Sequence, residues 1–127
     1  MILVDTSVWV DYLRAADAHL SVLLARNEVC CHPWVVGEIA CRHLRNRTEI
    51  LGGLQRLPQL TPAREHEVLY LIERRGLMGR GMGYIDAHLA TAALAQGCRL
   101  WTRDKRLIGA VTELGVLYSA PQVQGSA

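Results

Sequence analysis

Short apolar runs alternate along this chain with longer stretches in which apolar residues recur at every third or fourth position. The short runs predict strands, because a parallel strand covered on both faces shows little alternation of apolar and polar residues. We expect strands at residues 2–4, 29–31, 100–102 and 116–118. The longer stretches predict helices, several of them with a capping residue or proline at the start or a glycine at the end. We expect helices over residues 6–14, 20–27, 33–44, 50–57, 61–75, 84–96 and 105–113.

This alternation of strands and helices predicts an α/β fold, a three-layer α/β/α sandwich with a mostly parallel sheet of about five strands. We expect residues 1–127 to form a single domain, because two halves of this chain would each be too small to bury an adequate core. In such sheets, functional sites form at the edge where the parallel strands end. The residues that follow each predicted strand are therefore the first candidates for chemistry.

The composition narrows the class of protein. Half of the residues are hydrophobic and 20% are charged, which excludes an intrinsically disordered protein. The longest stretches without a charged residue, 87–98 and 114–127, contain polar residues and are shorter than the roughly 20 apolar residues of a membrane helix. The N-terminus lacks the basic segment of a secretory signal and meets Asp5 at once. We therefore expect a cytoplasmic protein that does not act in a membrane.

The four cysteines, Cys30, Cys31, Cys41 and Cys98, lack the Cys-x-x-Cys spacing of a zinc site. Cys30 and Cys31 are adjacent, so in a strand their side chains would point to opposite faces and would make a poor pair of ligands. We expect buried free thiols in a reducing compartment.

Four carboxylates occupy positions from which they can meet at the carboxyl edge of the sheet. Asp5 follows the first strand directly, and Asp104 lies two residues beyond the third. Glu38 lies about one turn into the helix after the second strand, and Asp86 lies in the first turn of the helix after a glycine-rich loop. Each acid alone is also explained as a helix cap, a turn residue, a partner of a helix dipole or a solvated residue. One shared site explains them better together, because Asp5 and Asp86 have apolar neighbours among which an unneeded carboxylate would be costly.

A cluster of ionised carboxylates requires a cation, because the negative charges repel one another. Oxygen ligands without a competing thiol or imidazole motif favour Mg²⁺, with Mn²⁺ as the alternative. Water on such an ion has a lowered pKa and can attack a phosphodiester. The chain carries 14 basic residues, 13 of them arginine, and 12 acidic ones, so setting four acids aside leaves 14 against eight, an excess of +6 elsewhere. This excess fits a polyanionic substrate.

The four acids lie in segments that resemble the acidic motifs of PIN-domain ribonucleases, and most closely those of the VapC-type toxins of bacterial toxin–antitoxin pairs. The resemblance covers nearly the whole chain, and the segments occur in the order of the family. They are Leu3-Val4-Asp5-Thr6-Ser7, Gly37-Glu38-Ile39, Tyr84-Ile85-Asp86-Ala87 and Thr102-Arg103-Asp104. The glycine-rich stretch 79–86 also resembles a sequence found in a subset of these toxins.

This resemblance implies a PIN-like fold and a metal-dependent endoribonuclease whose products carry a 3′-hydroxyl and a 5′-phosphate. The residues that would be catalytic and would hold one or two Mg²⁺ ions are Asp5, Glu38, Asp86 and Asp104. Ser7 and Thr102 match supporting hydroxyl positions beside the first and fourth acids, where they would bind a metal-bound water, although a helix cap explains Ser7 equally well. The resemblance also implies an RNA substrate, a homodimer and a cognate antitoxin whose C-terminal segment occupies the active-site groove.

Basic residues near the acids are candidates for contact with RNA phosphates. Arg103, Lys105 and Arg106 flank the fourth acid, and Arg80 lies in the glycine-rich loop before the third. His88 follows the third acid by two residues and would face another side of the helix, so we assign it no catalytic role.

Two other functions stay open on the sequence alone. A Mg²⁺-dependent aspartyl phosphotransfer or receiver-like domain is also a small α/β protein, but its dehalogenase form needs a second Asp where Ser7 stands, and a receiver needs a late lysine, for which only Lys105 is available. A non-catalytic RNA-binding protein would use the arginine clusters. Covalent phosphate after treatment with acetyl phosphate would support the first, and RNA binding in EDTA without scission would support the second.

Overall fold

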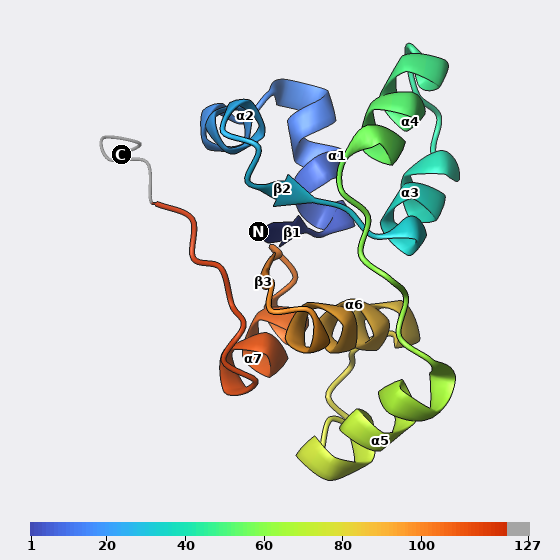
Figure 1. Cartoon of the computed structure of the whole chain (residues 1–127), viewed down its shortest axis with the longest axis vertical. Helices are drawn as coiled ribbons and strands as arrows, with labels where there is room; N and C mark the ends of the chain where they lie inside the picture. The colour runs from blue at the N-terminus through green and yellow to red at the C-terminus, as the bar shows by residue number, and fades with distance from the viewer. Residues whose placement is uncertain (122–127) are drawn as a thin grey trace.

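Three short parallel strands form the centre of the structure, a computed structural model that describes residues 1–121 (Figure 1). They are β1 (Ile2–Val4), β2 (Val29–Cys30) and β3 (Arg99–Trp101), and they lie in the order β2-β1-β3. Leu3 in β1 lies opposite Cys30 on one side and Leu100 on the other. Because the strands run in one direction, the residues that follow them meet at one edge of the sheet, as the sequence predicts.

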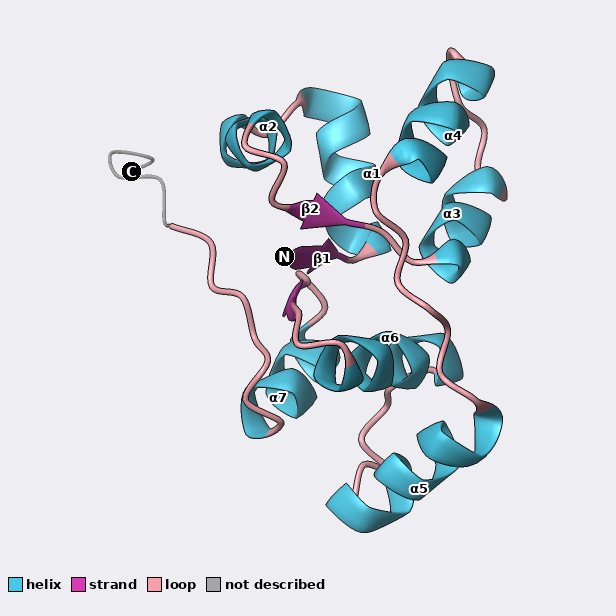
Figure 2. Ribbon diagram, viewed as in Figure 1, coloured by secondary structure: helices cyan, strands magenta, loops and turns pink. Residues whose placement is uncertain are grey.

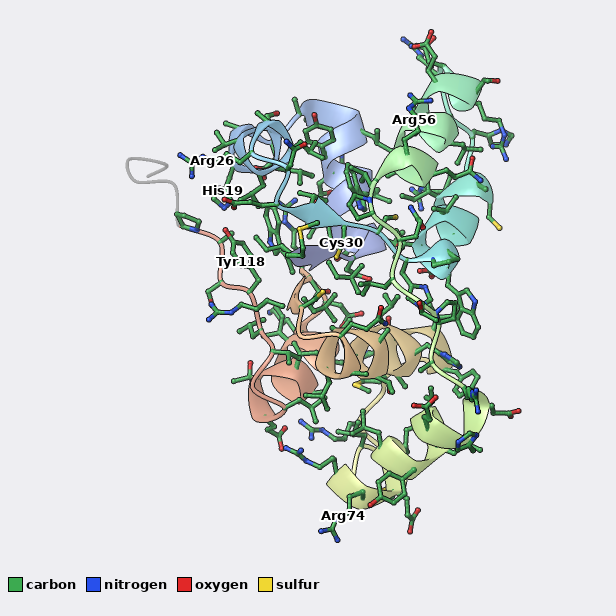
Figure 3. The ribbon with its side chains drawn as sticks, viewed as in Figure 1. His19, Arg26, Cys30, Arg56, Arg74 and Tyr118 are labelled. Carbon is green, nitrogen blue, oxygen red and sulfur yellow. The ribbon has the colours of Figure 1, made fainter. Side chains whose placement is uncertain are left out.

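The α/β class and the parallel sheet are confirmed, but the sheet has three strands rather than about five. The last predicted strand pairs with β3 only through a single parallel bridge, between Leu117 and Leu100. The hydroxyl of Tyr118 forms a hydrogen bond with the ring of His19 in helix α2 (Ala18–Ala25), and the two rings are stacked (Figure 3). This contact draws the chain toward α2 directly after the bridge, so a longer strand does not form beside β3.

A second single bridge extends the sheet beyond β2. The Cys31 N–H donates to the Pro58 carbonyl and the Leu60 N–H donates to the Cys31 carbonyl, each at 2.8 Å, so that Cys31 and Gln59 pair in parallel. Pro58 has no N–H with which to continue the ladder, and pairing stops at this residue.

The seven predicted helices are all present within the described residues. They are α1 (Thr6–Ala15), α2 (Ala18–Ala25), α3 (Pro33–Ala40), α4 (Arg47–Arg56), α5 (Glu65–Arg75), α6 (Tyr84–Ala95) and α7 (Lys105–Glu113). The end of α3 differs from the prediction, because the Arg47 guanidinium donates to the carbonyls of Ala40 and Arg42 and so satisfies the helix terminus there.

The start of α5 also differs from the predicted start at Thr61. The side chain of Glu67 accepts a hydrogen bond from the Arg64 N–H at 3.0 Å, which caps the helix at that point. Thr61 instead pairs with the Gln96 side chain, through its N–H at 3.0 Å and its carbonyl at 2.8 Å. The four residues before α5 are therefore not helical, and Thr61 ties this segment to the end of α6.

The helices form two groups around the strands. In the view of Figures 1 and 2, α1 to α4 lie above the strands and α5 to α7 lie below them. The chain crosses from β1 to β2 through α1 and α2, and then returns past β1 to β3 through α3 to α6, which is the doubly wound arrangement. Among residues 1–121, no helix is long and apolar enough to cross a membrane.

Three of the four cysteines are buried free thiols, as predicted, whereas Cys41 is exposed at the end of α3. Burial raises the pKa of Cys30 to about 12 and that of Cys31 to about 11. Both side chains therefore remain neutral thiols at physiological pH, and they contribute to the core rather than to a metal site.

Candidate active site

Asp5 is the centre of the candidate site and is buried, with 5% of its surface exposed. It follows β1 directly and caps α1, because its Oδ2 accepts a hydrogen bond from the Ser7 N–H at 3.3 Å. The same oxygen accepts shorter hydrogen bonds from the Ser7 hydroxyl at 2.6 Å and from the Thr102 hydroxyl at 2.9 Å. Two hydroxyl groups from separate segments therefore hold this carboxylate in one orientation.

Asp104 lies beside Asp5 because Thr102 contacts both. The Thr102 hydroxyl donates to Asp5 and accepts from the Asp104 N–H at 3.1 Å. Asp104 in turn caps α7, where its Oδ1 accepts from the Arg106 N–H at 2.9 Å. The prediction that the first and fourth acids project from the same edge of the sheet is confirmed, and Thr102 is the residue that connects them.

Glu38 and Asp86 reach the site from the two groups of helices. The Oε1 of Glu38, in α3, accepts a hydrogen bond from the Thr6 hydroxyl at 2.8 Å, which ties it to the residue next to Asp5. Asp86 is the third residue of α6, and its Oδ2 accepts from the Gly83 N–H at 3.1 Å. The sequence did not indicate this role of Thr6, for which its position beside Asp5 is the only local signal.

The four acids, which we call the acidic site, act on one another electrostatically. Burial raises the pKa of Glu38, and the charges of Asp5 and Asp86 raise it further, while the Thr6 hydrogen bond opposes this. Burial likewise raises the pKa of Asp86, with repulsion from Asp5 and Asp104 added and the Gly83 hydrogen bond opposing. The pKa of each of these two carboxyls is therefore raised in part by acids from other segments, as expected when the four side chains lie close together.

One oxygen of each acid is used within the protein, and the other is not. The hydrogen bonds described above involve Oδ2 of Asp5 and Asp86, Oδ1 of Asp104 and Oε1 of Glu38. The second oxygen of each carboxylate accepts no hydrogen bond from any residue in the described range 1–121. The four elements therefore position the acids by one oxygen and leave a second, hard oxygen ligand on each.

The donor set suits Mg²⁺ or Mn²⁺, because these ions prefer carboxylate oxygens. In residues 1–121, no three His, Cys, Asp or Glu side chains approach closely enough to enclose an ion between them. Mg²⁺ does not require such a cage, since it retains several waters and is commonly held by one or two carboxylates. The residues present thus fit a hydrated divalent cation rather than an ion enclosed by protein ligands.

The chain is similar to known proteins over most of its length. The family model of the PIN domain matches residues 2–112. The chain belongs to the PIN-domain family. It is 51% identical over 117 residues to "Ribonuclease VapC32" of Mycobacterium tuberculosis, from both strain CDC 1551 / Oshkosh and strain H37Rv, and the match covers 91% of this chain and 94% of the relative. This PIN domain is therefore of the VapC type.

A solved structure shares the fold at much lower sequence similarity. The crystal structure of PAE2754 from Pyrobaculum aerophilum matches this PIN domain with a TM-score of 0.58 and 18% sequence identity. The match covers 90% of this chain and 88% of that one. The predicted PIN-like fold is therefore confirmed.

The basic residues around the acidic site of this PIN domain fall into two kinds. Arg103 pairs with Asp11 and, at 2.8 Å, with Asp17, and its guanidinium lies 5.8 Å from the centre of the Trp101 ring. Arg80 pairs with Glu113 at the end of α7. Arg80 and Arg103, two of the residues predicted to contact the substrate, thus form ion pairs within the protein. The sequence did not indicate these pairs because the acids involved are distant from the arginines in the chain.

Lys105 and Arg106 differ from them, since both are exposed at the start of α7 and neither forms an ion pair with any residue in the described part of the chain. The Arg106 side chain lies across Gly81, to whose carbonyl it donates at 3.4 Å. A Cβ at Gly81, which has φ +80°, would lie 2.8 Å from the Arg106 Cδ, so this position requires glycine. The glycine-rich loop and Arg106 are therefore in contact beside Asp104.

Neutralising one acid is expected to stabilise this PIN domain. Because the pKa of Glu38 is raised above its ordinary value of 4.5, the folded chain binds this proton more tightly than the unfolded chain, and stability falls as the pH rises through that range. Glu38→Gln retains the acceptor for Thr6 and removes the charge. In EDTA at pH 7 we expect its Tm to rise by roughly 2–4 °C, or about 0.5–1 kcal/mol after allowance for solvent screening. Thermal melts at pH 7 and pH 4 check this, since the gain in Tm should be smaller at pH 4. A Tm of Glu38→Gln equal to or below the wild-type Tm at pH 7 would contradict the prediction.

Proposed function

We propose that this PIN domain is a Mg²⁺-dependent endoribonuclease that acts as the toxin of a toxin–antitoxin pair. The observation that carries the proposal is the acidic site, in which four acids from four segments each keep one carboxylate oxygen unused by the described residues. The 51% identity to a protein named as a ribonuclease supports RNA as the substrate. We infer a cytoplasmic location, because RNA substrates are found there.

Asp5, Glu38, Asp86 and Asp104 would hold one or two Mg²⁺ ions, with Mn²⁺ as a substitute. A bound ion supplies a water of lowered pKa and offsets the charge that develops on the phosphodiester. Ser7 and Thr102 contribute by orienting Asp5, because both hydroxyls donate to its Oδ2 and also accept backbone N–H groups, of Arg103 at 3.0 Å and of Asp104 at 3.1 Å. With these bonds made, positioning of Asp5 is a better role for them than direct binding of water.

The RNA backbone is proposed to lie across Lys105 and Arg106, whose charges no carboxylate within residues 1–121 neutralises. Arg80 and Arg103 are each paired with a carboxylate, and a phosphate would have to compete with these partners. Lys105 and Arg106 are therefore expected to contribute more to RNA affinity than the two paired arginines.

Two apolar surfaces support the proposed protein partners. Trp9, Leu13, Leu24, Ile50 and Leu54 line an open cavity of about 220 Å³ between α1, α2 and α4, which suits an apolar segment of the antitoxin. For the homodimer we propose the face of α5, where Leu69 and Tyr70 are exposed. Acidic residues occupy its first turn and arginines its last, so two antiparallel copies would bring opposite charges together.

The proposed activity is tested with purified RNA, the wild-type chain and Asp86→Asn, each in Mg²⁺ and in EDTA. We expect scission only for the wild-type chain in Mg²⁺, and fragments that carry 3′-hydroxyl and 5′-phosphate ends. Circular dichroism in parallel confirms that Asp86→Asn is folded. Equal scission by the variant, or scission that persists in EDTA, would contradict the proposed site, and RNA binding without scission in any lane would favour a non-catalytic RNA-binding protein.

A further inference from the structure

A cluster of four aromatic rings joins the two groups of helices close to the acidic site. Trp34 of α3 contacts His88 of α6, with ring centres 3.9 Å apart, and lies 6.4 Å from the Tyr84 ring. Tyr84 and His88 pack edge to face at 4.6 Å, and the ring of His32 stands 6.0 Å from Trp34. We call these four residues the aromatic cluster; Trp34 is its central member because it contacts each of the others.

The aromatic cluster connects two helices that otherwise pack against different neighbours. α3 packs mainly against α4 and α1, and α6 packs mainly against α5 and β3. In Figure 1, α3 belongs to the upper group of helices and α6 to the lower one. The ring contacts of Trp34 with Tyr84 and His88 are therefore a direct side-chain link between these two helices.

Each of these helices also carries one member of the acidic site, Glu38 on α3 and Asp86 on α6. Trp34 precedes Glu38 by four residues on α3, which places the two side chains on the same side of the helix. Asp86 is two residues from Tyr84 and from His88 on α6, so its side chain faces another side of the helix from these two rings. Because each acid is fixed on its own helix, the distance between Glu38 and Asp86 depends on how α3 and α6 pack, and Trp34 makes ring contacts between these two helices.

The two histidines of the aromatic cluster act through their rings. Both are buried, with 0% and 3% of their surfaces exposed. The Nδ1 of His32 accepts the Trp34 N–H at 3.0 Å and so caps α3, while its Nε2 and the Nδ1 of His88 have no partner among the described residues. Packing against Trp34, rather than a hydrogen bond to it, is therefore the contribution of His88.

Repulsion between Glu38 and Asp86 tends to separate α3 from α6, and the apolar ring contacts oppose it. We propose that Trp34 is a positioning residue, which holds Glu38 and Asp86 at the spacing that a divalent cation requires. This proposal rests on the function proposed above. It assigns Trp34 no contact with RNA or with the reacting atoms.

The test measures Mn²⁺ affinity directly, by electron paramagnetic resonance of free Mn²⁺, for the full chain without RNA. We expect Trp34→Leu to weaken Mn²⁺ binding by about 10-fold or more, the range found when groups that orient metal ligands are removed. Trp34→Phe keeps an aromatic ring against His88 and should retain most of the affinity. The matched control is Leu20→Ala, which removes a fully buried side chain from α2, distant in the fold from the aromatic cluster, and should bind Mn²⁺ like the wild-type chain.

All variants are compared at a temperature well below their measured Tm, so that only folded protein is titrated. Wild-type affinity in Trp34→Leu, or an equal loss in Leu20→Ala at matched Tm, would overturn the positioning role of Trp34. Mn²⁺ binding by the wild-type chain that is lost in Asp86→Asn would leave the proposed metal site standing in either case. No Mn²⁺ binding by the wild-type chain would instead contradict the metal-dependent function itself.

Discussion

Asp5→Asn is expected to reduce RNA cleavage in Mg²⁺ by at least about 100-fold. Removing a group that only orients a metal ligand typically costs 10- to 100-fold, and Asp5 is a proposed ligand at the centre of the acidic site. Asn has nearly the same shape and keeps an oxygen that accepts from Ser7 and Thr102, so the fold should persist while the negative charge is lost. Initial rates of cleavage of a defined RNA, together with thermal melts, measure the two effects separately.

Glu28→Gln is the matched control for this substitution. Glu28 precedes β2, so it lies at the opposite edge of the sheet from the acidic site. Like Asp5→Asn, Glu28→Gln removes one negative charge, and it should leave the cleavage rate within about two-fold of the wild-type rate. If Asp5→Asn cleaved as fast as Glu28→Gln in equal Mg²⁺, Asp5 would have no part in the reaction.

Leu100→Ala is expected to lower the free energy of unfolding by about 3 kcal/mol, within the range of roughly 2–5 kcal/mol for such truncations. Leu100 is fully buried in β3, opposite Leu3 of β1, and it also forms the single bridge to Leu117. The truncation leaves a cavity in the core beside β1, and Leu100 is only two residues before Thr102 in the chain. Urea unfolding followed by circular dichroism measures the change.

The comparison variant for Leu100 is Val22→Ala on α2, whose side chain is 43% exposed. It removes apolar atoms that remain in contact with water when the chain folds, so its effect should stay within about 0.5 kcal/mol. Similar losses for the two variants would mean that β3 is not part of the stabilising core.

The order of strands and helices, and the edge at which Asp5 and Asp104 meet, could be predicted from the sequence because both depend on local pattern. Apolar runs identify the strands, and in a parallel sheet the residue after each strand has only one edge at which to lie. The sheet was predicted to be larger than it is. The last apolar run is indistinguishable by pattern from a strand, but Tyr118 is bound by His19, which lies 99 residues earlier in the chain.

The surroundings of the acids were accessible to sequence reasoning only in part. In the sequence, Ser7 lies two residues after Asp5 and Thr102 lies two residues before Asp104. The structure shows that both hydroxyls donate hydrogen bonds to Asp5. The ion pairs of Arg103 with Asp11 and Asp17 join residues 92 and 86 positions apart, and no local pattern indicates them. Four basic residues that look alike in the sequence therefore differ in how freely they can meet a phosphate.

By itself, the sequence determined where the seven helices and the first three strands lie, that the fold is α/β, and that Asp5 and Asp104 follow strands at one edge of the sheet, because hydrophobic periodicity and parallel topology act over short distances. Tertiary structure alone decided how many strands pair, which arginines are neutralised, and how Trp34 and His88 set α3 against α6. These features depend on contacts between side chains that are far apart in the chain, and such contacts exist only after the helices have packed around the sheet.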